Sequence, residues 1–249
     1  MLAVLLGLVG LAVGSFLNVL IDRLPRQGSI LFPPSHCEAC GHRLYPWDLV
    51  PVLSYLLLRG RCRYCRATIR RRIPLVEALT GLIFGLLAWH YGPGWELVSA
   101  LVYLGLFIPI FFIDLENGII PDALVFPGMA LALGFSFVLG RPLLRDTLAG
   151  GGVGFGLMLL PYLLSRGGMG AGDVKFAGLM GLVNGFPLIA VGLLFAFVTG
   201  GLLASLLLLF RVKGRKDPVP LGPFLVAGSV FALLWGRQFL DLYLGLLGR

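Results

Sequence analysis

The chain has 249 residues, of which 58% are hydrophobic and 13% charged, and its mean hydropathy is +0.93. This composition excludes a soluble globular domain, which needs enough polar surface to cover its core, and indicates a protein that crosses a membrane several times. The net charge of +8 does not indicate nucleic-acid binding, because the basic residues lie beside apolar spans and do not alternate with aromatic residues that could stack on bases.

The hydropathy pattern predicts an all-α polytopic membrane protein with about eight transmembrane helices, since each crossing needs about 20 mostly apolar residues. The first span has no basic segment before it and is interpreted as an anchor rather than a removable signal peptide. The sixth span is short, and a turn signal at Asn184 to Pro187 separates it from the seventh; one long helix over 174–210, giving seven spans, is the alternative. The predicted spans are 1–21, 74–91, 95–113, 122–140, 147–165, 174–186, 187–210 and 220–247.

Basic residues predict the orientation of these spans. Residues 22–72 contain ten arginines and three acids, so the positive-inside rule places this loop in the cytoplasm. With alternating spans, the loops 166–175 and 211–217 lie on the same side, whereas Arg141 and Arg145 are exceptions. The predicted organisation is a first transmembrane helix (1–21), a cytoplasmic insert (22–73) and a transmembrane bundle (74–249).

The insert contains all four cysteines of the chain, in two Cys-x2-Cys pairs separated by 21 residues. A segment this small has a marginal hydrophobic core, and paired cysteines close to zinc-ribbon spacing predict a structural zinc site with four thiolate ligands. Two disulfides are the alternative, but they would need an oxidising compartment. The predicted ligands of this zinc-ribbon-like insert are Cys37, Cys40, Cys62 and Cys65, while the neighbouring His36 and His42 are interpreted as surface residues.

Two carboxylates stand at predicted ends of spans, where ionisable groups are costly and usually mark function. Asp114 closes the third span, and Asp173 begins the sixth after a glycine-rich run over 167–172. The predicted topology places both at the cytoplasmic border. Two neighbouring carboxylates can share one proton, so that one activates water and the other polarises a scissile carbonyl, and glycines let the backbone approach an extended substrate. The pattern therefore predicts an intramembrane aspartic protease.

Other acids and other functions compete with this interpretation. Asp122 is an alternative first acid, although its place at the start of the fourth span favours a structural role at the helix N-terminus. Glu77 is expected to point into the bundle. A proton- or ion-coupled transporter is the main alternative function, but its acids should lie near the midplane of the membrane. A noncatalytic assembly factor would leave both acids unexplained.

Several motifs together resemble the type IV prepilin leader peptidases, integral-membrane aspartic proteases of the Gly-x-Gly-Asp kind. Presenilin-like proteases share that motif, but they normally have a Tyr-Asp partner and a Pro-Ala-Leu sequence, and here Ile113 precedes Asp114. The resemblance covers nearly the whole chain. It rests on Gly14-Ser15-Phe16-Leu17-Asn18-Val19, the four-cysteine insert, Pro74-Leu75-Val76-Glu77, the segments 114–122 and 168–175, and Pro220-Leu221-Gly222-Pro223-Phe224.

The resemblance implies a function and a set of site residues. A leader peptidase of this family cleaves type 4 prepilins and type II secretion pseudopilins after a glycine, on the cytoplasmic side of the bacterial inner membrane. It also implies N-methylation of the new amino terminus with S-adenosylmethionine, although no glycine-rich nucleotide fingerprint marks a donor site. The expected catalytic residues are Asp114 and Asp173, the supporting residues Gly170, Gly172, Lys175, Glu116 and Asp122, and the methyl-transfer candidates Gly60 and Glu77.

Overall fold

The structure is a computed structural model that describes residues 1–140, 142–165, 167–212, 214 and 219–246. Arg141, Arg166 and most of the loop 211–217 entered the orientation prediction and lie outside the described residues.

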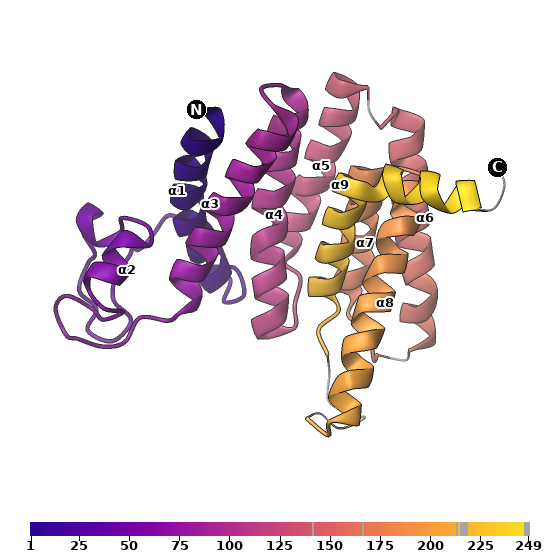
Figure 1. The fold of residues 1–249 in the computed structure, drawn as a ribbon. Helices are drawn as coiled ribbons and strands as arrows, with labels where there is room; N and C mark the ends of the chain where they lie inside the picture. Colours follow the sequence, from indigo (N-terminus) through magenta and orange to yellow (C-terminus); the bar gives the residue numbers. More distant parts are fainter. Residues whose placement is uncertain (141, 166, 213, 215–218, 247–249) are drawn as a thin grey trace. The chain divides into compact units, whose positions relative to one another are not determined.

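Helices form almost all the regular structure of the described residues, with two isolated antiparallel β-bridges besides. This confirms the all-α prediction. The elements are α1 (Leu2–Arg23), the 3-10 helix η1 (Pro46–Asp48), α2 (Leu53–Leu57), α3 (Arg72–Tyr91), α4 (Trp95–Asn117), α5 (Asp122–Leu139), α6 (Leu144–Leu164), α7 (Ala171–Asn184), α8 (Leu188–Leu209) and α9 (Gly222–Leu246) (Figure 1).

Seven helices in the described part of the chain, α1, α3 to α6, α8 and α9, are long and apolar enough to cross a membrane. The sixth predicted span, 174–186, corresponds to α7, which has only 14 residues and is not among these seven. The alternative of a single helix over 174–210 is wrong, because α7 ends at Asn184 and Gly185 follows it with a φ of +71°. A positive φ suits glycine, which has no side chain to clash, and the helix does not continue through it.

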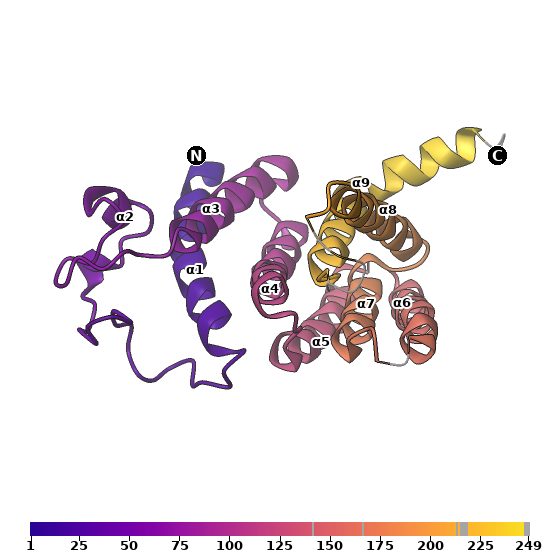
Figure 2. The same cartoon turned by 90° about the horizontal axis from the view of Figure 1, so that it is seen from below.

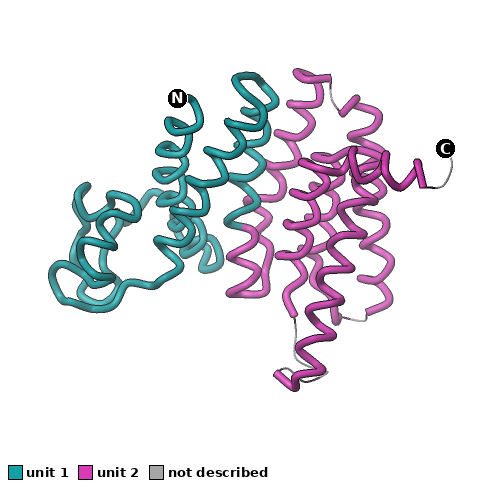
Figure 3. Tube along the Cα trace, in the orientation of Figure 1, with its two compact units in different colours: residues 1–109 teal, residues 110–249 magenta. Residues whose placement is uncertain are grey.

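The chain divides into two compact units, residues 1–109 and 110–249 (Figure 3). In the first unit α1 packs on α3 through glycines. A Cβ atom added to Gly10 would lie 2.8 Å from the Cα atom of Gly81, and one added to Gly14 would lie 2.7 Å from the Cα atom of Glu77. The residue number rises along α1 from one pair to the next while it falls along α3, so the two helices are antiparallel. The predicted division into 1–21, 22–73 and 74–249 is based on which segments enter the membrane, whereas the two units are defined by compactness. The predicted division therefore stays a prediction.

In the second unit α7 lies between α5 and α6, as Figure 2 shows, and also packs against α9. Its contact with α6 is backbone on backbone, because a Cβ atom at Gly181 would overlap the carbonyl group of Gly150. Close packing of small residues is a common way for membrane helices to associate. The short helix α7 is therefore held firmly at the centre of this unit.

Candidate active site

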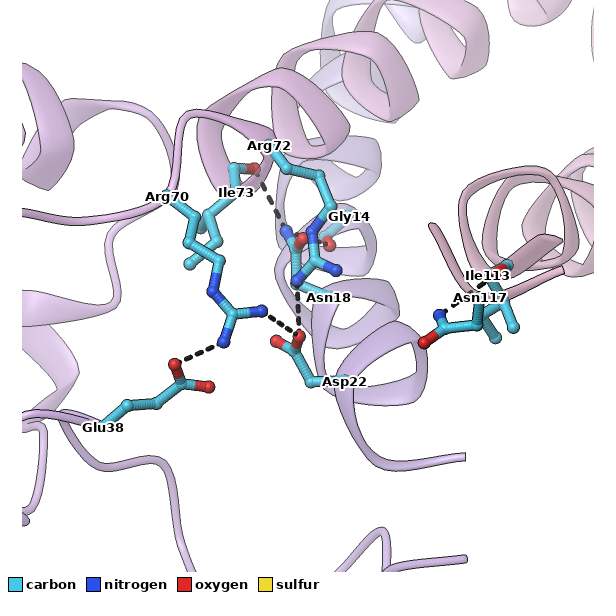
Figure 4. Close-up of polar contacts among 9 residues, drawn as sticks. All are labelled: Gly14, Asn18, Asp22, Glu38, Arg70, Arg72, Ile73, Ile113 and Asn117. Atoms are coloured by element: carbon cyan, nitrogen blue, oxygen red, sulfur yellow. Dashed lines mark hydrogen bonds and ion pairs between the residues drawn. The ribbon is translucent and has the colours of Figure 1, made fainter. Parts of the chain in front are cut away.

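Asp114 lies in the last turn of α4 and not at its end. The predicted span stopped at Ile113, but the helix continues to Asn117, whose side-chain amide donates to the Ile113 carbonyl over 3.2 Å (Figure 4). The helix can extend because nothing interrupts it before Gly118, which has a φ of +67°. Polar residues outside an apolar span can thus still be helical.

The Asp114 side chain is buried, with the residue 4% exposed. Its Oδ2 atom accepts a hydrogen bond of 2.8 Å from the backbone N–H of Gly222. Gly222 begins α9, so this N–H has no acceptor within its own helix, and the positive end of the helix dipole favours a carboxylate there. A Cβ atom at position 222 would lie 2.5 Å from Oδ2, so glycine alone fits without a shift.

Gly222 was missed as a site residue by sequence reasoning. The block from Pro220 to Phe224 carried part of the family resemblance, but glycine is frequent in membrane helices and nothing local connects it to Asp114. The one usable signal is the Gly222-Pro223 pair, because proline is favoured in the first turn of a helix.

Asp173 is the third residue of α7, the helix that is too short to be a candidate span. Burial, and after it the negative charge of Asp114, raise the pKa of Asp173 to about 6, although a hydrogen bond with the backbone of Gly170 opposes this. The two acids that the sequence singled out therefore lie within electrostatic reach of each other in the second unit.

Two glycines of the motif allow close approaches around Asp173. A Cβ atom at Gly170 would lie 3.3 Å from Oδ2 of Asp173, and one at Gly172 would lie 3.0 Å from the Cβ atom of Ile120. The segment that joins α4 to α5 thus packs directly on the start of α7. Both predicted supporting glycines adjoin the site.

Asp122 is engaged with a different partner. Both of its carboxylate oxygens accept from Nζ of Lys175 at 2.8 Å, and the same ammonium group lies 5.7 Å from the ring centre of Phe126. Asp122 is exposed at the start of α5, and Glu116 is exposed in the last turn of α4. Asp122 and Lys175 therefore form a bridge between α5 and α7.

The four cysteines of the insert come together as predicted. Their sulfur atoms all lie within 4.8 Å of one another, and the Cys37 and Cys65 sulfurs are 3.8 Å apart. Two ligands of a tetrahedral zinc ion, each about 2.3 Å from the metal, would be about 3.8 Å apart, whereas a disulfide needs about 2.05 Å. The arrangement fits a bound metal ion and not the alternative of two disulfides.

The two cysteine pairs sit in matching turns. The N–H of Cys37 donates to the carbonyl of His42, and that of Cys62 donates to the carbonyl of Ala67. Burial alone would raise the pKa of Cys37, but hydrogen bonds from backbone N–H groups and neighbouring thiols outweigh it and lower the pKa to about 7. His42 is exposed and its ring lies 3.7 Å from that of Tyr64, which agrees with its interpretation as a surface residue.

The two methyl-transfer candidates adjoin the two ends of α2: Glu77 contacts the residue before this helix, and Gly60 follows it. Buried Glu77 of α3 accepts a 2.7 Å hydrogen bond from the N–H of Val52, the residue before α2. Gly60 follows α2 with a φ of +69°, and a Cβ atom there would lie 2.9 Å from the Tyr55 hydroxyl.

A polar network ties the insert to α1 and α3 (Figure 4). Asp22 at the end of α1 pairs with Arg72 at 2.8 Å and with Arg70 at 3.1 Å, and Arg70 also pairs with Glu38 of the first cysteine turn. Asn18 donates to the carbonyl of Ile73 over 3.1 Å. The insert is thus attached to both helices that flank it.

Comparison with known proteins gives two family matches along the chain. The family model of the bacterial peptidase A24 N-terminal domain matches residues 8–91, and that of the type IV leader peptidase family matches residues 101–205. No solved structure matches the chain.

Three curated relatives share the name prepilin leader peptidase/N-methyltransferase. The one from Pseudomonas aeruginosa is 32% identical over 269 residues, covering 97% of this chain and 93% of the relative. That from Pseudomonas putida is 34% identical over 96% of this chain and 93% of the relative. That from Myxococcus xanthus is 41% identical over 87% of this chain, but the match spans only 65% of the relative.

The seven long apolar helices of the described residues are those of a multi-pass membrane protein. The chain belongs to the type IV leader peptidase family.

Proposed function

We propose that the protein removes the basic leader from type 4 prepilins, and from the pseudopilins of type II secretion, by cleaving after a glycine. The observation that carries this proposal is the pair formed by Asp114 and Asp173, in which each acid has a backbone partner and Asp173 responds to the charge of Asp114. The family membership and the names of the relatives support it. They give no support to the transporter alternative.

The two acids divide the work of hydrolysis. The N–H of Gly222 and the start of α9 stabilise Asp114 as the ionised carboxylate, which takes a proton from the attacking water. Asp173 is the protonated partner and donates a hydrogen bond to the scissile carbonyl oxygen while water oxygen bonds to the carbonyl carbon. The C–N bond then breaks as the leaving nitrogen receives a proton from Asp114.

The proposed site lies on the cytoplasmic side of the bacterial inner membrane. Ten arginines in the insert and its flanks support this orientation. A basic leader could then enter from the cytosol while the apolar helix of the substrate remains in lipid. Exposed Glu116, two residues beyond Asp114, is positioned to attract the leader, whereas the insert itself carries a net positive charge.

The second activity is N-methylation of the new amino terminus with S-adenosylmethionine as the methyl donor. The names of the relatives support this assignment, and Glu77 and Gly60 stay the candidate residues. The four cysteines would hold a zinc ion that fixes the two turns of the insert, a structural role that supplies no chemistry to the reaction.

Cleavage of a prepilin by the purified protein in lipid tests the proposal, with products identified by mass spectrometry. Asp114→Asn and Asp173→Asn should each abolish cleavage, because an amide keeps the shape of the side chain but cannot transfer the proton. Asp122→Asn is the matched control and should still cleave, since Asp122 pairs with Lys175. A mass increase of one methyl group when S-adenosylmethionine is added would report methylation. A folded Asp114→Asn or Asp173→Asn variant that still cleaves would contradict the site.

A further inference from the structure

The short helix α2 exposes an apolar face that the insert does not cover. Leu53, Leu56 and Leu57 are 52%, 64% and 73% exposed, while Ser54 points inward and is buried. Single exposed leucines are ordinary on protein surfaces, but a contiguous group marks a contact with a partner or with lipid. The identity of that partner follows from the depth at which α2 is held.

Contacts between α1 and α3 give this depth. Arg72 pairs with Asp22 where α3 begins, and these charges mark the polar boundary of the two helices (Figure 4). Glu77 lies five residues further along α3, which at 1.5 Å per residue is about 8 Å deeper. Because Glu77 accepts the N–H of Val52, the residue before α2 is fixed at that same depth.

The surroundings of α2 agree with a position at the depth of Glu77. Figure 1 shows α2 at the level of the lower parts of α1 and α3, and Figure 2, seen from below, shows it to one side of both helices. On α3, Leu75 and Leu82 lie on either side of Glu77 along the helix and are 56% and 61% exposed. An apolar surface on a spanning helix faces lipid.

We propose that α2 is embedded in the cytoplasmic leaflet and that its leucine face contacts lipid acyl chains. The flanking residues are of the types that occupy the headgroup layer. Exposed Trp47 stacks on Tyr45 before α2, with ring centres 5.0 Å apart, and exposed Arg59 and Arg61 follow it. The insert is therefore not a purely aqueous domain.

Lipid is the occupant because contacts within the chain already hold α2 at the depth of the acyl chains. The insert is joined to the spanning helices α1 and α3 at its two ends, and the bond between Glu77 and Val52 fixes it a second time. No substrate or second copy of the chain is needed to bring the leucines to an apolar environment.

Photo-crosslinking in lipid nanodiscs tests this contact. A benzophenone amino acid replaces Leu56 or Leu57, one at a time, in the full-length protein, and adducts are identified by mass spectrometry after irradiation. The same probe at Leu82 is the positive control for a lipid-facing position, and at exposed Arg43 of the first cysteine turn it is the aqueous control. Only variants that elute as single species in gel filtration are compared.

Phospholipid adducts at positions 56 and 57 as at 82, and none at 43, are the expected result. Absence of lipid adducts at 56 and 57 while Leu82 labels would overturn the proposal. Crosslinks to a second copy of the chain in place of lipid would overturn it as well.

Discussion

Gly222 brings a backbone N–H, and no side chain, against the Asp114 carboxylate. The hydrogen bond of 2.8 Å joins a helix start to a buried acid, a combination that gives charge-assisted bonds their strength. Position 222 therefore combines a steric requirement with an electrostatic one.

Replacing Gly222 with alanine should disable cleavage. The added Cβ atom would lie 2.5 Å from Oδ2 of Asp114, so α9 or the acid must shift, and a misplacement of about 1 Å can lower a rate about 100-fold. The kcat for leader cleavage measures this loss. Gly201→Ala on α8 is the control, because no atom lies within 4 Å of its added Cβ, and it should cleave normally. Equal rates for the two variants would refute the role of the contact.

Asp173 should give cleavage a falling limb on the alkaline side. Its pKa is raised to about 6 by burial and by the charge of Asp114, so the acid is protonated below that pH and loses its proton above it. As the proton donor it must be protonated, and kcat/KM should therefore fall about tenfold per pH unit well above pH 6. The Asp122→Asn variant should show the same limb. A rate that is flat up to about pH 8 would argue against a protonated Asp173.

Sequence reasoning located these acids but not their partners. Asp114 and Asp173 stand out because charge is rare beside apolar spans. The Gly222 contact and the pair of Lys175 with Asp122 join residues that are 108 and 53 positions apart, and no local pattern encodes such distances.

At the scale of elements, the packing of α6 on α7 fixes where Asp173 can lie. Three consecutive glycines lie on α6, but a helix presents successive residues in different directions. Gly150 and Gly151 would each overlap α7 if they carried a Cβ atom, whereas Gly152 meets no atom within 4 Å.

Gly150→Ala should therefore destabilise the protein and lower cleavage, while Gly152→Ala should do neither. An added methyl group in a tight contact costs about 1–3 kcal/mol of stability, and here it would push α7 and its acid away from α6. Thermal unfolding in detergent and the cleavage rate measure the two effects. If both variants behave alike, the close contact between α6 and α7 does not control the site.

Helix existence was predictable here, and helix ends were less so. The bilayer demands long apolar segments with internally satisfied backbones, so the eight predicted spans include the seven long helices, and the short α7 was counted as the other span. The ends depend on single residues instead. Gly118 follows the end of α4 at Asn117, beyond Asp114, and Gly185 separates α7 from α8.

At the scale of the whole molecule, the four cysteines and the two acids belong to different compact units. All four cysteines lie in residues 1–109, while both acids and Gly222 lie in residues 110–249. A metal site that closes a small domain usually contributes much of its folding free energy.

Cys62→Ser should release the bound metal and lower methylation more than leader cleavage. Cys62 is the buried member of the four, so its loss should unfold the insert, whereas the acids of the second unit keep their own partners. Metal content and the masses of both products can be measured in one sample. His42→Ala is the control and should retain the metal, since His42 is an exposed neighbour and not a ligand. Equal losses of the two activities would contradict this separation.

The hydrogen bond between Gly222 and Asp114 also sets an order of events during synthesis. Its partners are separated by 108 residues, and α9 leaves the ribosome after the helices that carry both acids. A nascent chain already contains both acids when α7 is complete, but it lacks the amide that holds one of them. Proteolytic competence should therefore arise only after α9 has inserted, which would protect the cell from a partly assembled peptidase.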